Sequence, residues 1–163
     1  MSRAIRRIIC VGNRFVSGDD TGPRVFDFLS KFRLPDGVEV IDGGLAGLNL
    51  LSLVESSEKV VFVDSLSGFC EHGKVAELER DALLNGIHAI NYGHSGGINY
   101  LFRALPFVCE GKLPDIFVVG SEGIADNKTI KSIAEKSLEI IAVGVRDDHD
   151  YEVMTQRGTC KNE

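Results

Sequence analysis

Short runs of apolar residues alternate along the chain with segments in which apolar residues recur every three or four positions. The runs predict buried β-strands, and the recurring pattern predicts amphipathic helices. The predicted strands cover 5–11, 38–41, 59–63 and 114–119, and the predicted helices begin near 21, 48, 96 and 129. Alternating strands and helices with short connections predict a parallel sheet between two layers of helices.

The segment 68–78 alternates apolar and polar residues around Gly73-Lys74, which indicates either a hairpin or an antiparallel edge strand. The predicted fold class is therefore α/β, a three-layer sandwich with a mainly parallel, Rossmann-like twisted sheet and one antiparallel edge. No linker or internal repeat divides residues 1–163, so we expect one domain. The tail, 146–163, is charged and without periodicity, and we expect it to be mobile.

Composition restricts the classes of partner. The chain has 163 residues and a formal charge of −6, which argues against nucleic acid and against an anionic membrane, since both require a basic surface. No apolar stretch approaches the roughly 20 residues of a membrane helix. The apolar run after Arg6-Arg7 stops at Gly12 and is too short for a signal peptide.

The four cysteines are spread along the chain without Cys-x-x-Cys spacing. This spacing gives neither a thiolate zinc site nor a disulfide framework. We therefore expect reduced thiols in a cytoplasmic protein.

Three apolar runs lead into residues that could bind a metal. The first strand is followed by Asp19 and Asp20, the strand 59–63 by Asp64, and the run 87–90 by His94. If these runs are neighbouring parallel strands, their carboxyl ends meet, where ligands bind in open sheets of this type. Two carboxylates and an imidazole suit nickel, zinc, manganese or ferrous iron, and residue types alone do not choose among them.

Each of these residues also has an ordinary structural interpretation. Asp19 or Asp20 could cap the helix that starts near residue 21. Asp64 could accept hydrogen bonds from the following loop, and His94 could be a hydrogen-bonded polar residue. The metal hypothesis depends on their convergence.

A competing hypothesis comes from Gly93-His-Ser95-Gly-Gly97, which matches the Gly-x-Ser-x-Gly elbow of α/β-hydrolases. Ser95 would be the nucleophile, with Asp115 or Asp126 as the acid and His149 as the base. Only 68 residues follow Ser95 (163 − 95), and His149 lies in a polar tail. This hypothesis also leaves the acidic turn and Asp64 without a role.

A series of short motifs in a fixed order resembles the hydrogenase maturation proteases. These endopeptidases trim the C-terminal extension of the large subunit of nickel–iron hydrogenases once nickel is in place. The resemblance runs from about residue 8 to 141, and its motifs are Val11-Gly-Asn13, Gly18-Asp-Asp20, Gly22-Pro23, Val40-Ile-Asp-Gly-Gly44, Val61-Phe-Val-Asp64, His94 and Val118-Val-Gly120.

The resemblance implies that Asp19, Asp64 and His94 contact nickel already held by the precursor, or another divalent metal in its place. Gly18-Asp19-Asp20 stands one place later than the family pattern, so Asp20 is an alternative ligand or a second acid.

The resemblance also implies that Asp42, Gly43 and Gly44 handle the precursor's C-terminal peptide. The expected partner is a hydrogenase large-subunit precursor, with neither nucleic acid nor membrane. A metal-bound water or a carboxylate general base could break the peptide bond. A binding module that kept the fold but lost catalysis is a third class.

Overall fold

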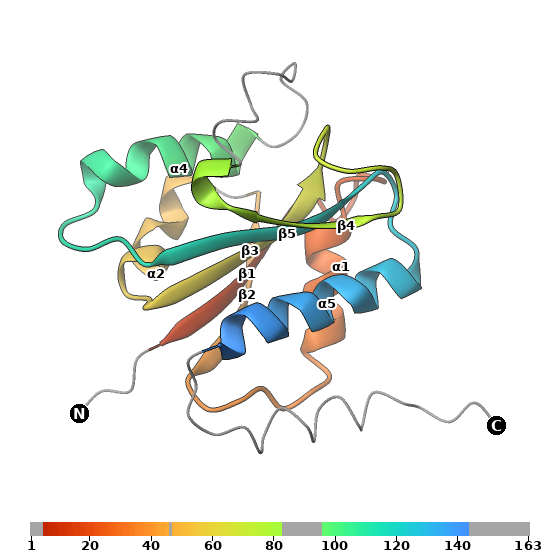
Figure 1. The fold of residues 1–163 in the computed structure, drawn as a ribbon, viewed down its shortest axis with the longest axis horizontal. Coiled ribbons are helices and arrows are strands. Elements are labelled where there is room, and N and C mark those ends of the chain that lie inside the picture. The colour runs from red at the N-terminus through yellow and green to blue at the C-terminus, as the bar shows by residue number, and fades with distance from the viewer. Residues whose placement is uncertain (1–4, 46, 83–95, 144–163) are drawn as a thin grey trace.

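The computed structural model describes residues 5–45, 47–82 and 96–143, and within them five strands form one sheet in the order β2-β1-β3-β5-β4 (Figure 1). Four strands run parallel and the fifth, at one edge, is antiparallel to its neighbour. The strands are β1 (Arg6–Val11), β2 (Val38–Gly44), β3 (Lys59–Leu66), β4 (Val75–Glu79) and β5 (Asp115–Glu122).

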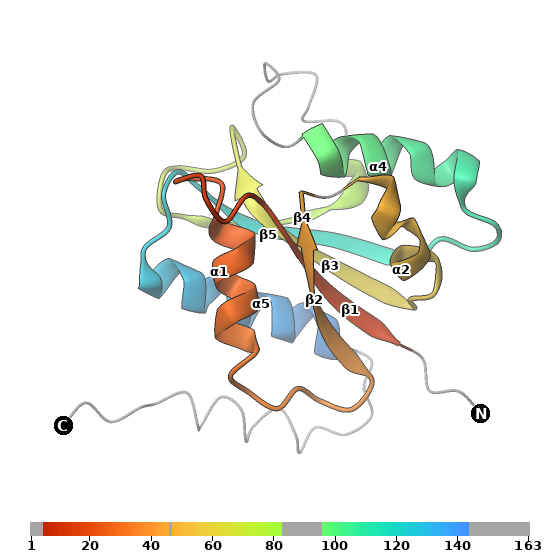
Figure 2. The ribbon, with the colours of Figure 1, turned by 180° about the vertical axis from the view of Figure 1, so that it is seen from behind.

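Helices cover both faces of this sheet (Figures 1 and 2). Alternate side chains of the central strands point to opposite faces and form two apolar clusters, as the period of a strand requires. Helices α1 (Thr21–Leu29) and α5 (Asn127–Ala142) pack on one face, and η1 (Leu48–Leu50), α2 (Leu51–Glu55) and α4 (Gly96–Val108) pack on the other. The predicted three-layer α/β sandwich with a mainly parallel sheet is confirmed.

The structure corrects two details of the sequence prediction. Of the two alternatives for 68–78, the antiparallel edge is right and the hairpin is wrong, since β4 pairs with β5. Asp64 lies within β3 rather than after its end, because β5 continues beside it and pairs Asp64 with Gly120 and Leu66 with Glu122. The run 87–90 and the tail 146–163 lie outside the described residues.

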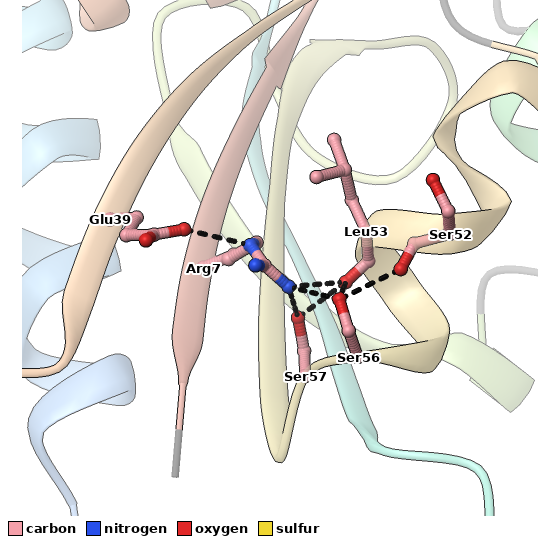
Figure 3. Close-up of polar contacts among 6 residues, drawn as sticks. All are labelled: Arg7, Glu39, Ser52, Leu53, Ser56 and Ser57. Atoms are coloured by element: carbon pink, nitrogen blue, oxygen red, sulfur yellow. Dashed lines mark hydrogen bonds and ion pairs between the residues drawn. The ribbon is translucent and has the colours of Figure 1, made fainter. Parts of the chain in front are cut away.

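Arg7 fixes the opposite, amino-terminal end of the sheet (Figure 3). Its side chain is buried, with the whole residue 7% exposed, and its guanidinium donates to Glu39 of β2 at 2.9 Å. The same group donates to the Leu53 carbonyl at 2.8 Å and to the Ser57 hydroxyl at 2.9 Å. These bonds tie β1 to β2 and to the end of α2.

No helix within the described ranges is both long enough and apolar enough to span a membrane.

Candidate functional site

The loop between β1 and α1 folds back so that Asp19 returns to the end of β1. The Asn13 amide donates to the Asp19 carbonyl at 2.8 Å and lies 3.2 Å from the Asp19 carboxylate. Gly12 permits this return, because its φ is +144° and a Cβ there would lie 2.2 Å from the Asp19 carbonyl oxygen. The loop therefore holds one carboxylate at the carboxyl edge of the sheet.

Asp64 brings a second carboxylate to the same edge. It follows Val63, the last residue of β3 that pairs with β1, and is only 5% exposed. Its carboxylate accepts a hydrogen bond of 2.7 Å from the Ser65 amide. Burial raises the pKa of Asp64 well above its ordinary value and the negative charge of Asp19 raises it further, while the Ser65 hydrogen bond acts in the opposite direction. The two carboxylates are thus close enough to repel each other.

Asp20 occupies the N-cap position of α1, but its side chain makes no capping hydrogen bond. Asp20 therefore stands at the capping position that the sequence suggested for the acidic turn, but its carboxylate does not cap the helix. Of the two neighbouring acids, Asp19 is the one whose charge acts on Asp64. This arrangement favours Asp19 over Asp20 as the partner of Asp64.

His94 and Ser95 lie outside the described residues. Helix α4 begins at Gly96, two positions after His94, and packs on the face of the sheet to which Asp64 points. Its first turn lies toward the carboxyl ends of the parallel strands (Figures 1 and 2). Within 5–45, 47–82 and 96–143, no three His, Cys, Asp or Glu side chains form a group that could hold a metal. The trio of Asp19, Asp64 and His94 stays a prediction.

Asp42 lies at the end of β2, exposed and close to the loop that carries Asp19. Its carboxylate accepts a 3.1 Å hydrogen bond from the Gly44 amide and pairs with Arg14 at 3.6 Å. The register between β1 and β2 shifts here, so that Gly43 is an extra residue in a bulge. A Cβ on Gly43 would lie 2.8 Å from a Val11 methyl, so a larger residue in this bulge would force neighbouring side chains to shift.

Arg14 is a residue that the sequence did not single out. Its guanidinium makes two bonds to Asp27 of α1, at 2.6 and 3.1 Å, and also pairs with Asp42. The hydrogen bond from Arg14 lowers the pKa of Asp27. No local sequence pattern predicts that a single arginine in a polar loop will pair with acids elsewhere in the chain.

The acids proposed for a serine triad are poorly placed. Asp115 begins β5 and pairs in register with Lys59, the first residue of β3, so it lies at the edge opposite to the carboxyl ends. Asp126 caps α5 and accepts a 2.8 Å hydrogen bond from the Thr129 amide. The structure thus contradicts Asp115 as the acid, and Asp126 already has a structural role.

The fold and its edge define an open-sheet α/β protein with a carboxylate pair where such proteins bind ligands. The family model for hydrogenase maturation protease, HycI, matches residues 23–141. The chain belongs to this family.

Relatives of known name agree with this assignment. The chain is 31% identical over 151 residues to a Methanocaldococcus jannaschii protein with the provisional name hydrogenase maturation protease, covering 82% of this chain and 92% of that protein. The hydrogenase maturating endopeptidase HybD from Escherichia coli has a similar structure, with a TM-score of 0.66, 25% identity and coverage of 87% and 92% of the two chains.

The [NiFe] hydrogenase maturation protease HybD from Thermococcus kodakarensis shares the fold, with a TM-score of 0.61, 21% identity and coverage of 83% and 95%. The chain is thus a peptidase of hydrogenase maturation. The family match supports neither a serine hydrolase nor a module without catalysis.

Proposed function

We propose that the protein is an endopeptidase that removes the C-terminal extension of a nickel–iron hydrogenase large-subunit precursor after nickel insertion. Nickel enters as part of the substrate, held by the precursor. Asp19, Asp64 and His94 contact it and fix the precursor against the carboxyl edge of the sheet. Asp42, Gly43 and Gly44 line the path of the extended C-terminal peptide. The reaction takes place in the cytoplasm.

The observation that carries this proposal is the burial of Asp64 beside Asp19. The ionised form of a buried carboxylate beside a second negative charge costs free energy, and either a proton or a nearby cation removes that cost. A divalent ion on the precursor would supply that cation. Carboxylate and imidazole ligands are acceptable to nickel.

Asp64 also suits proton transfer. A carboxylate whose pKa is raised by burial is a stronger base once it is ionised, so Asp64 could take a proton from the attacking water. Nickel could alternatively activate the water as a Lewis acid. Both routes require Asp64 to face the scissile bond.

Cleavage of purified, nickel-loaded precursor, followed by mass spectrometry, tests the proposal. We expect Asp64→Asn, Asp19→Asn and His94→Ala to lower the cleavage rate by about 100-fold or more. Asp115→Asn is the matched control, because it removes a carboxylate at the other end of the same sheet. Wild-type rates in Asp64→Asn and His94→Ala would refute the assigned site.

The competing mechanism has its own test. A serine hydrolase would lose activity in Ser95→Ala and would react with a fluorophosphonate probe. We expect full cleavage by Ser95→Ala and no labelling. A binding module would hold the precursor tail without shortening it, which the same mass spectra would reveal.

A further inference from the structure

Large apolar side chains lie exposed on the loops around the carboxylate pair. Nine large apolar residues are exposed among the described residues, and five of them lie at the carboxyl edge of the sheet. We call these five the apolar rim: Phe15, Val16, Leu45, Leu48 and Ile124. A concentration of exposed apolar residues around a site marks an interaction surface.

The rim is built on loops that are tied to one another. The β1–α1 loop, which carries Phe15, is bonded to the end of β2 through Gly12 N to Gly44 O at 2.8 Å. On its other side, Gly18 lies near Ile124 of the β5–α5 loop, since a Cβ added to Gly18 would lie 3.9 Å from an Ile124 side-chain carbon. Arg24 of α1 adds a hydrogen bond of 2.5 Å to the Ala125 carbonyl of that loop. The segment from β1 to α1 is therefore bonded both to the end of β2 and to the β5–α5 loop.

The conformation of the β1–α1 loop leaves the Phe15 side chain exposed to solvent. It is 93% exposed, and its amide donates to the Asn13 side chain at 3.0 Å. Two further bonds, Val16 N to Asn13 O and Asp19 N to Val16 O, close the loop on either side. The loop that positions Asp19, the proposed nickel contact, thus also carries the exposed Phe15.

We infer that the apolar rim docks the folded apolar surface of the hydrogenase large-subunit precursor around its nickel. This inference rests on the proposed function and adds a second contact beyond the metal and the peptide. The rim residues come from two loops, from just beyond the end of β2 and from the start of η1 rather than from one line along a strand, so they suit a folded surface better than an extended tail.

Charge argues against a second copy of this chain as the occupant. A twofold dimer through the rim would bring Asp19, Asp42 and Asp64 of one copy toward the same acids of the other. The whole chain also carries a charge of −6. A partner that presents a metal cation within an apolar surface complements both the acids and the rim.

Steady-state cleavage and direct binding of the nickel-loaded precursor test this inference with Phe15→Ala and Ile124→Ala. We expect KM and Kd to rise about tenfold in each variant, with kcat within about twofold of wild type, since the rim contacts ground state and transition state alike. Phe107→Ala is the matched control, because Phe107 is 89% exposed but lies at the far end of α4. Thermal unfolding confirms that each variant folds.

The outcomes separate the two proposals. Wild-type KM and Kd in both rim variants, with cleavage intact, would overturn the rim and leave the proposed function. Binding without cleavage by the wild type, weakened by Phe15→Ala, would support the rim and overturn the proposed function. Neither binding nor cleavage by the wild type would overturn both. Self-association that Phe15→Ala abolishes, with KM unchanged, would assign the rim to a second copy and overturn the inference.

Discussion

Burial raises the pKa of Asp64 in β3, and the charge of Asp19, in the loop after β1, adds a smaller shift in the same direction. The folded chain therefore assembles two repelling carboxylates, one of them buried, at the edge where its family's chemistry is expected. Groups that cost stability in this way are typical of functional sites, where selection favours activity over stability.

Asp64→Asn should stabilise the isolated protein at neutral pH. The folded-state pKa of Asp64 is raised above its unfolded value, so folding favours the protonated form. The loss of stability caused by ionising Asp64 is absent below the pKa of the unfolded state. It grows as pH rises from the unfolded-state pKa to the folded-state pKa. Asn keeps an oxygen for the Ser65 amide but carries no charge. We expect a rise in Tm on the order of a few degrees near pH 7.

Thermal unfolding of wild type and Asp64→Asn between pH 3 and pH 8, without added metal, checks this expectation. The difference in Tm should shrink toward pH 3, where the wild-type carboxyl is protonated in both states. Asp115→Asn, an exposed carboxylate on the same sheet, should show no such rise with pH. A lower Tm for Asp64→Asn at pH 7 would contradict the assigned electrostatics.

The sequence predicted the sheet because its central strands are continuous apolar runs. Val60, Val61, Phe62 and Val63 are fully buried, as a strand covered on both faces requires. The predicted strand ended at Val63, three residues before the true end of β3 at Leu66. The apolar run stops at the charged Asp64, and the prediction took that as the end of the strand. The pairing of Asp64 with Gly120 depends on a strand far along the chain, which no local pattern reveals.

The site was predicted only as a set of candidates. Proximity of Asp19 to Asp64 follows from how the β1–α1 loop folds back through Asn13, and this depends on tertiary hydrogen bonds. The sequence already favoured Asp19 over Asp20, and the loop geometry adds only that Asp19 is the acid whose charge acts on Asp64. The exposure of Phe15 was unpredictable, because an aromatic residue after a strand is as readily buried as exposed.

Gly22→Ala should destabilise the protein even though alanine is the better helix former. Gly22 lies in the first turn of α1, and a Cβ there would meet the Val11 carbonyl oxygen at 2.0 Å, a backbone atom that cannot rotate away. Helix propensity alone predicts a gain of about 1 kcal/mol. We expect instead a loss of about 3 kcal/mol from overpacking, measured by urea denaturation.

Gly111→Ala separates steric from backbone effects. Gly111 has a φ of +95° but open space around its Cα, so alanine there meets only backbone strain, a loss of about 1–2 kcal/mol. Equal losses in the two variants would show that the contact with Val11 does not limit the approach of α1 to β1.

Arg14→Gln should lower stability slightly and only while Asp27 is ionised. The hydrogen bond from Arg14 lowers the folded-state pKa of Asp27, so its contribution is present above the unfolded pKa and is lost as pH falls through the folded value. The two side chains are 42% and 50% exposed, so the effect is small and roughly 1 M salt should remove it. Urea midpoints at pH 3 and pH 7, in low and high salt, measure it. An Arg14 effect that persists in Asp27→Asn would show that the pairing with Asp42 dominates.

Arg7→Met should cause a large loss of stability without altering the site directly. The buried guanidinium satisfies the Leu53 carbonyl and the Ser57 hydroxyl, and methionine fills a similar volume without donors (Figure 3). Removing one partner of a buried polar network costs about 3 kcal/mol. Glu39→Gln is the control: its side chain is 49% exposed, so the loss should stay below about 1 kcal/mol. Urea denaturation gives both values. If Glu39→Gln cost as much as Arg7→Met, the ion pair with β2, rather than the bonds to the end of α2, would hold this end of the sheet.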